Sequence, residues 1–177
     1  KGAGALVRAN DAAMQPLTLG GGQESGLRAG TQDVPAICGL GLAAKLAESE
    51  REESVAHMTE LTGLLKSEIN GRGLGRLIEP GAPAQALLPN ILSFIVDGPP
   101  AEVFLHHLDA RGVMASAGSA CQSNKRSMNP ALFAIGLEED EARRLLRLSI
   151  GKKSTREEVL RGVEVLEEVR SELARHA

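Results

Sequence analysis

The sequence predicts an α+β fold, in which helices pack against a sheet of few strands. Three features predict it. Residues 91–96 form a near-continuous apolar run of strand length between turn residues. Residues 34–70 show the three- and four-residue spacing of apolar positions that is typical of a helix, and residues 159–173 repeat it. Between these helical segments, short strand-like and helix-like stretches alternate along the chain.

Composition limits the classes of function. A hydrophobic fraction of 42% and a charged fraction of 24% over 177 residues are those of a globular protein. The net charge of −3 and the lack of Trp and Tyr disfavour nucleic acid as a partner. No apolar run approaches the roughly 20 residues of a membrane span. Cys38 and Cys121 have no disulfide or CxxC pattern, and the four histidines lack ligand spacing. We therefore expect a cytoplasmic protein without a metal site.

The first part of the chain is predicted to lead into one long helix. Residues 5–7 read as a short strand, and a glycine-rich loop follows at residues 20–31. Asp33 is the expected N-cap and Pro35 the first-turn residue of a helix that glycines 71 and 73 end. Unbroken, this helix would be roughly 50 Å long. Its apolar stripe comprises Met58, Leu61, Leu65 and Ile69.

The rest of the chain is predicted to form short strands and helices around the run at 91–96, which we expect to be a central strand buried on both faces. In the strand at 146–150, alternation places Arg147 and Ser149 away from the core. Residues 80–83 read as a turn-rich loop, and residues 154–158 as a capping box before the last helix. Further strands are expected at 74–79 and 113–116, and helices at 101–111 (with Val103, Leu105 and Leu108 inward), 130–135 and 139–145.

Cys121 is a candidate nucleophile because it follows a run of Ser, Ala and Gly residues that leaves room around the sulfur. Gly118 permits backbone angles that other residues avoid, and Lys125 and Arg126 favour a thiolate. The alternative is a half-buried cysteine in a turn, and the residues alone leave both interpretations open. Cys38 lies in an apolar helical segment, so we expect it to be a core residue.

Two other stretches could bind anions. The glycine loop at 20–31 offers backbone N–H groups, with donors from Arg28 and Thr31, but it matches neither the dinucleotide fingerprint nor the P-loop. A flexible surface loop is the alternative. Arg147, on the strand face away from the core, could bind a carboxylate in bidentate fashion. The alternative is a solvated surface arginine.

Together these motifs resemble class I cysteine desulfurases, pyridoxal-phosphate enzymes of fold type I in the class V aminotransferase family. The segment Ser-Ala-Gly-Ser-Ala-Cys at 116–121 is similar to the active-site cysteine segment of that family. Residues 1–6 resemble the segment after the cofactor lysine, and residues 20–31 the glycine loop of the family. Residues 88–90 and 146–151 match as well, and together the matches cover nearly the whole chain. Ser25 departs from the pattern, because the family usually has Arg there.

The resemblance implies a role for each matching residue. Cys121 would take sulfur from L-cysteine as a persulfide, leaving L-alanine, and would pass the sulfur to an acceptor protein for iron–sulfur cluster assembly. Arg147 would bind the substrate carboxylate, and Asn90 would lie near the substrate. Thr31 would reach the phosphate of pyridoxal phosphate in the other subunit of a homodimer. The implied cofactor is therefore pyridoxal 5'-phosphate, and the implied substrate is L-cysteine.

The lysine that holds the cofactor in the family lies just before the segment that matches Lys1, so we expect this chain to lack it and to be inactive alone. The resemblance implies the C-terminal part of such an enzyme, with the end of the large domain at 1–33, a linking helix at 34–71 and the small domain at 72–177. Two alternatives remain: a selenocysteine lyase-like enzyme, and a non-catalytic docking module with the small-domain fold.

Overall fold

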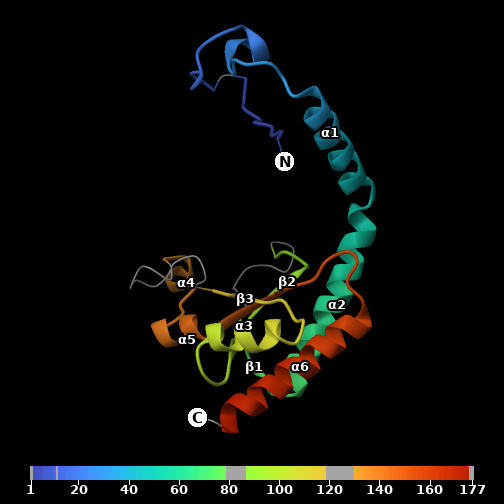
Figure 1. Ribbon diagram of the computed structural model, residues 1–177, viewed down its shortest axis with the longest axis vertical. Helices are drawn as coiled ribbons and strands as arrows, with labels where there is room; N and C mark the ends of the chain where they lie inside the picture. Colours follow the sequence, from blue (N-terminus) through green and yellow to red (C-terminus); the bar gives the residue numbers. More distant parts are fainter. Residues whose placement is uncertain (1, 11, 79–86, 119–129, 176–177) are drawn as a thin grey trace. The chain divides into compact units, whose positions relative to one another are not determined.

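The computed structural model describes residues 2–10, 12–78, 87–118 and 130–175. They belong to two compact units, Lys1–Glu52 and Glu53–Ala177, which are described separately (Figure 1). The second unit contains a sheet with helices, which confirms the predicted α+β class. No helix within the described ranges is both long enough and apolar enough to cross a membrane.

The first unit consists of coil, the short 3-10 helix η1 (Gln23–Gly26) and the helix α1 (Val34–Ser49). The predicted N-cap is confirmed, because the Asp33 carboxylate accepts a hydrogen bond of 3.1 Å from the backbone N–H of Ala36. The predicted strand at 5–7 is wrong: these residues are exposed coil. An isolated extended segment gains no ladder hydrogen bonds, so a short apolar run alone does not make it a strand.

The long helix predicted for residues 34–70 is divided at Glu50 into α1 and α2 (Arg51–Gly71). Just before the break, the Ser49 hydroxyl donates to the carbonyl of Leu46 at 3.0 Å, a local contact that competes with regular helical bonding. The predicted end is confirmed: Gly73 has a positive φ of 58°, and the Leu74 N–H donates back to the Ile69 carbonyl.

The prediction that Cys38 is a core residue is wrong in this structure, because Cys38 is exposed on α1. The same holds along the whole helix, in which no described side chain is buried. The apolar sequence of α1 therefore indicates a surface suited to burial, but its own unit does not cover it.

The second unit is built on four strands, β1 (Gly75–Leu77), β2 (Ile91–Val96), β3 (Ser116–Ala117) and β4 (Leu145–Ser149). Their order is β1-β2-β4-β3, and all neighbours are antiparallel. The strand predicted at 91–96 is confirmed as a central strand. It is buried at Leu92, Phe94, Ile95 and Val96, but Ile91 and Ser93 are only partly covered or exposed. The strand predicted at 113–116 is shorter than expected and shifted, because β3 comprises only Ser116 and Ala117.

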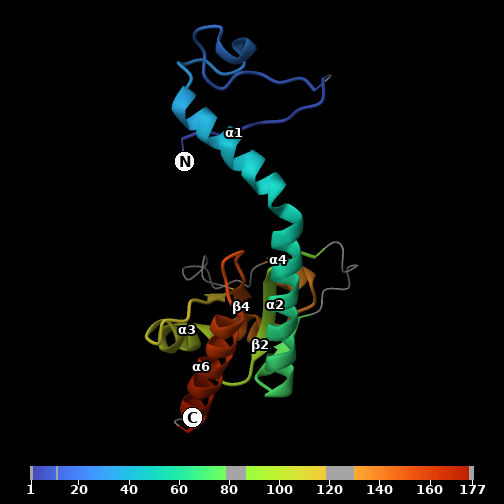
Figure 2. The ribbon, with the colours of Figure 1, turned by 90° about the vertical axis from the view of Figure 1, so that its right-hand side faces the viewer.

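Helices α2, α3 (Ala101–Asp109) and α6 (Arg156–Arg175) enclose the main core with one face of the sheet. Figure 1 shows α3 and α6 close together below the strands, and Figure 2 shows α2 beside α6. Arg72 links these two helices through ion pairs with Glu68 at 2.9 Å and Glu167 at 2.8 Å. In α3 the buried residues are Ala101, Phe104 and Leu108. The predicted inward position of Leu108 is confirmed, Leu105 packs against the core while partly buried, and the prediction misses Phe104.

The opposite face of the sheet is covered only in part. Ile95 and Leu145 pack there with Leu137, next to the short helices α4 (Pro130–Ala134) and α5 (Glu139–Arg143). Residue 145, predicted to end a helix, instead begins β4. Farther along β4 this face is exposed, at Arg147 and Ser149.

Candidate functional site

Arg147 lies in the middle of β4, on the sheet face that the main core does not use. The alternation predicted from sequence is confirmed, because Leu146 is fully buried while Arg147 and Ser149 are exposed. Among the residues that the structure describes, no hydrogen bond or ion pair engages the Arg147 side chain. A guanidinium without a protein partner keeps all its donors available for a planar anion.

Two serines flank Arg147 across the sheet. Ser93 on β2 and Ser116 on β3 are both direct register partners of Arg147, and both are partly buried. Directly opposed residues in an antiparallel pair project from the same face, with Cβ atoms about 4.5–5.5 Å apart. The arginine is therefore bordered on each side by a small hydroxyl residue. Sequence reasoning did not identify Ser93, because strand order cannot be read from local patterns.

Cys121 lies outside the described residues, but the strand that leads to it is described. The backbone N–H of Gly118 donates to the Leu145 carbonyl at 3.0 Å, so β4 anchors the chain three residues before Cys121. Along β3 the chain runs from the register partner of Arg147 toward Leu145, and there it leaves the described residues.

Gly118 has a different role from the one predicted. Its φ lies outside the left-handed region, so unusual backbone angles do not explain it. A Cβ at this position would instead lie 2.7 Å from Cδ2 of Leu145 and 3.2 Å from Cδ1 of Leu132. The glycine allows the strand to pass close to the apolar cluster under α4.

Asn90 lies just before β2, at the same end of the sheet as Ser149. Its side-chain Nδ2 donates to the Ile150 carbonyl at 3.3 Å, and its own carbonyl accepts from the Ile150 N–H at 2.8 Å. The predicted site residues therefore lie close in the sheet, Arg147 on β4 and Asn90 just before the neighbouring strand β2. The Asn90 amide, however, is engaged with the backbone of β4.

Thr31 and the glycine loop lie in the first unit. Glu24 and Ser25 adopt left-handed φ values of 50° and 58° within η1, and the backbone N–H of Gly30 donates to Gln23 Oε1 at 3.3 Å. These contacts bend the loop back on itself just before Thr31. Thr31 is exposed, and in the described part of the chain its hydroxyl has no hydrogen-bond partner. It is thus free to donate to a phosphate oxygen.

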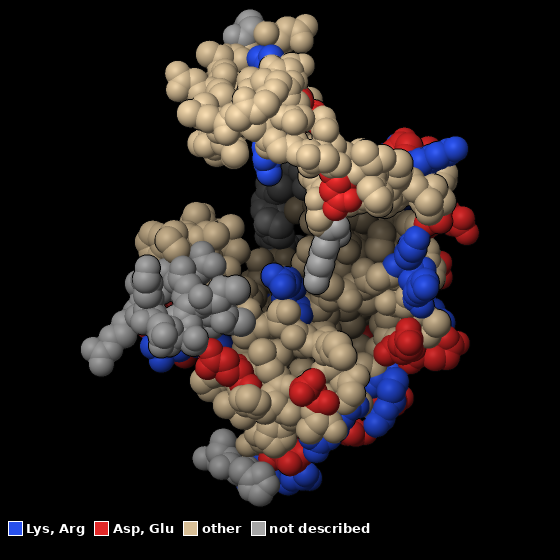
Figure 3. Space-filling model, turned by 45° about the horizontal axis from the view of Figure 1, so that its top comes forward, with Lys and Arg blue, Asp and Glu red and all other residues tan. Residues whose placement is uncertain are grey.

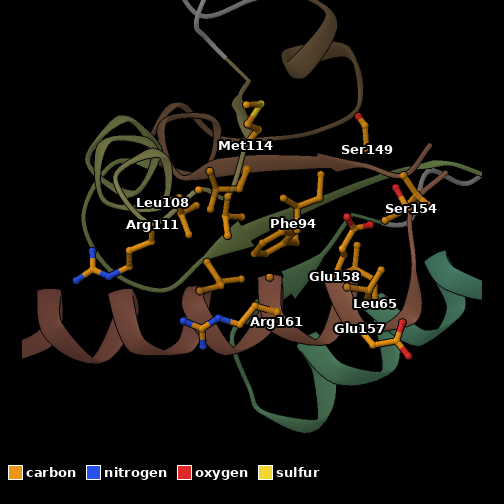
Figure 4. A pocket seen from close by; sticks show the side chains of 18 residues that line it. Leu65, Phe94, Leu108, Arg111, Met114, Ser149, Ser154, Glu157, Glu158 and Arg161 are labelled. Atoms are coloured by element: carbon orange, nitrogen blue, oxygen red, sulfur yellow. The ribbon is translucent and has the colours of Figure 1, made fainter. Parts of the chain in front are cut away.

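A pocket of about 710 Å³ lies on the other face of the sheet, between the strands and α6. Figure 4 shows Phe94 and Leu108 at its centre, with Arg111, Arg161 and Glu158 toward its margin. Arg147 is not among its lining residues. The pocket therefore does not include Arg147, although Ser149 on the same strand lines it, and no sequence motif indicated it.

Charges on the surface are mixed. Figure 3 shows basic and acidic side chains interspersed over the face in view. Ion pairs such as Arg111–Glu172 also join opposite charges among the described residues. The described residues contain no group of three His, Cys, Asp or Glu side chains arranged to hold a metal ion. Arg147 is thus an exposed cation that has no ion pair among the described residues, on the strand that pairs with β3.

Comparison with known proteins finds relatives in both sequence and structure. It is 37% identical over 169 residues to cysteine desulfurase IscS of Clostridium botulinum (strain Kyoto), which covers 96% of this chain and 43% of the relative. It is 36% identical over 149 residues to human selenocysteine lyase, covering 82% and 34% of the two chains. A solved NifS-like protein matches with a TM-score of 0.77 and 32% identity, over 93% of this chain and 41% of the other.

The chain thus spans between about one third and about two fifths of the length of these relatives. The family description Aminotransferase class-V matches residues 1–161, which is nearly the entire sequence. The sequence match and the shared fold agree, and the chain belongs to the aminotransferase class-V family.

Proposed function

We propose that this chain supplies the thiol and the carboxylate-binding arginine of a cysteine desulfurase. The observation that carries the proposal is the pairing of Ser116 with Arg147, which joins the strand leading to Cys121 to an exposed guanidinium. The relatives named cysteine desulfurase support the choice of L-cysteine as substrate. We further propose a homodimer that delivers the sulfur to an acceptor protein.

In this mechanism Arg147 binds the carboxylate of L-cysteine through two parallel N–H···O bonds and so fixes the orientation of the substrate. The Cys121 thiolate then attacks the substrate sulfur. The carbon–sulfur bond of the substrate breaks, a sulfur–sulfur bond forms at Cys121, and the carbon that loses sulfur gains a proton to give L-alanine. An accessible thiolate is suited to this attack, because it is the most nucleophilic side chain near neutral pH.

The family uses pyridoxal phosphate, which when bound supplies the electron sink for breaking the carbon–sulfur bond. The described residues fit part of such a site. The exposed Thr31 hydroxyl is a free donor for a phosphate oxygen, next to a loop held in shape by Gln23. The remaining contacts would come from the part of the family fold that this chain does not match. We therefore expect the chain by itself to develop no cofactor absorbance.

The deciding experiment uses the cofactor-loaded full-length protein that carries this chain. In Cys121→Ala, alanine and sulfide formation from L-cysteine should vanish while the cofactor absorbance stays. Cys38→Ser is the matched control and should retain activity. Full activity of Cys121→Ala would contradict the proposal. Absence of any cofactor binding would instead support a docking module.

Selenocysteine lyase is the second candidate, because a protein of that name matches 82% of the chain. The two substrates differ only in sulfur or selenium, and Arg147 would bind the carboxylate of either. Rates measured with L-cysteine and L-selenocysteine in the same preparation distinguish them. A rate with L-cysteine that is negligible beside that with L-selenocysteine would favour the lyase.

A further inference from the structure

The part of β4 that follows Arg147 is held by a neighbouring strand on one side only. The ladder with β3 includes Leu146 and Arg147, whereas the ladder with β2 continues to Ser149. A strand end with one neighbour frays more easily than one with two. Contacts at the end of the β2–β4 ladder therefore control how firmly the backbone beneath Arg147 is held.

Asn90 makes two hydrogen bonds to Ile150 at the end of this ladder. Its carbonyl accepts the Ile150 N–H at 2.8 Å, and its side-chain Nδ2 donates to the Ile150 carbonyl at 3.3 Å. The side-chain amide thus adds a link where the ladder ends. One of the two N–H groups of Nδ2 is therefore used within the sheet, on Ile150.

Beyond Ile150 the chain is fixed by further polar contacts. Ser154 Oγ accepts from the N–H of Gly151 at 3.0 Å, and the Ser154 N–H donates to the Gly151 carbonyl at 3.0 Å. His57 Nε2 on α2 lies 2.8 Å from the Ser154 carbonyl. These contacts tie the turn after β4 to the helix layer, and Asn90 provides the side-chain tie to β2.

We propose that Asn90 is a positioning residue for Arg147, acting through the backbone of β4. The inference rests on the proposed function of Arg147 and assigns Asn90 a role other than substrate contact. Bidentate recognition of a carboxylate tolerates errors of only about 0.5 Å and 10–20°. A frayed end three residues from Arg147 would spread the guanidinium over more orientations and weaken its hold on the substrate.

The structural half of the proposal is tested by amide hydrogen exchange in the chain itself. Asn90→Asp keeps the size of the side chain but removes the Nδ2 donor, and Asn90→Ala removes the group entirely. Both should speed exchange of the Ile150 N–H. Asn70→Ala, at the exposed end of α2, is the matched control and should leave that exchange unchanged. Unchanged exchange at Ile150 in both Asn90 variants would overturn the proposal.

The functional half is tested in the cofactor-loaded full-length enzyme. Asn90→Asp and Asn90→Ala should raise KM for L-cysteine by roughly 3- to 10-fold, the worth of about one hydrogen bond, with little change in kcat. The inhibition constant of cysteamine, which lacks a carboxylate, should stay the same. In an Arg147→Ala background, either Asn90 change should have no further effect on KM.

A KM effect that persists in the Arg147→Ala background would mean that Asn90 contacts the substrate directly, and would overturn the positioning role. A wild-type enzyme that does not turn over L-cysteine would contradict the proposed function instead. The exchange measurement does not depend on turnover, so the two failures are distinguishable.

Discussion

Ser116 on β3 is paired with Arg147 on β4, so the strand that leads to Cys121 and the strand that presents the exposed guanidinium form one ladder. A shift of β3 along β4 would move Arg147 relative to the cysteine segment. The close approach of Gly118 to Leu145 limits such a shift. The ladder therefore fixes, relative to Arg147, the point at which the chain toward Cys121 leaves the sheet.

Loss of the Arg147 guanidinium should weaken substrate binding. A charge-assisted hydrogen bond contributes about 1.5–3 kcal/mol, so Arg147→Ala should raise KM for L-cysteine by roughly 10- to 150-fold. Arg147→Lys should recover only part of this, because an ammonium cannot form the bidentate contact. Steady-state kinetics of the full-length enzyme check it. Arg143→Ala, an exposed arginine of α5, is the control, and an equal loss there would contradict a specific role for Arg147.

The core depends on Phe94, which is fully buried between the sheet and the helices. Phe94→Ala should lower the free energy of unfolding by about 3–5 kcal/mol, because it removes the ring and leaves a cavity. Phe133→Ala provides the matched control: this ring is 72% exposed, and the change should be within about 0.5 kcal/mol. Urea denaturation followed by circular dichroism measures both. Similar losses in the two variants would contradict the assigned core.

Two glycine-to-alanine changes should alter the stability of the fold in opposite directions. A Cβ at Gly75 would lie 2.2 Å from the Ile95 carbonyl oxygen, which belongs to the backbone of the neighbouring strand. Gly75→Ala should therefore cost about 1–3 kcal/mol or prevent pairing of β1. Gly162 in α6 has open space around its Cβ position, so Gly162→Ala should stabilise the protein by about 0.5–1 kcal/mol. Thermal denaturation should shift the melting temperature down for the first and up for the second.

Glu141 should make stability depend on pH. The backbone N–H of Glu138, 3.1 Å away, and the neighbouring Arg76 guanidinium hold the pKa of Glu141 below its ordinary value of about 4.5. The unfolded chain therefore takes up this proton first as the pH falls. The stabilisation from Glu141 is present above about pH 4.5 and is lost as the pH falls through the folded-state pKa.

Glu141→Gln keeps the size of the side chain and removes its charge. It should be less stable than the wild type at neutral pH, and the difference should shrink and disappear in acid. Urea midpoints measured across the acid range check this. A difference that stays constant with pH would show that the charge of Glu141 does not stabilise the fold.

Local features were predictable from the sequence because the signal lies within a few residues. The Asp33 cap and the Thr155–Glu158 capping box form as expected. In the capping box the Glu158 N–H donates to Thr155 Oγ1 at 3.2 Å, and the Thr155 N–H donates to the Glu158 carboxylate at 2.8 Å. Alternation likewise predicted that Arg147 faces away from the core. Each of these depends on backbone geometry rather than on distant partners.

Features that depend on distant partners were not predictable. Packing between segments far apart in the chain determines the strand order and the short length of β3. It also determines that Phe104 is buried in α3. The contact of Asn90 with Ile150 joins residues 60 positions apart, so no local pattern indicates it. Cys38 is exposed although it lies in an apolar helix, because apolar side chains are buried only where another segment covers them.

The most direct test of the account is mass spectrometry of Cys121 after the cofactor-loaded full-length enzyme is mixed with L-cysteine in the absence of a thiol acceptor. The account predicts that the peptide containing Cys121 gains the mass of one sulfur atom, in step with the alanine formed. The gain should be lost in Cys121→Ala and slowed in Arg147→Ala at limiting substrate. Alanine formation at the full rate with unmodified Cys121, or an added sulfur on Cys38 alone, would contradict it.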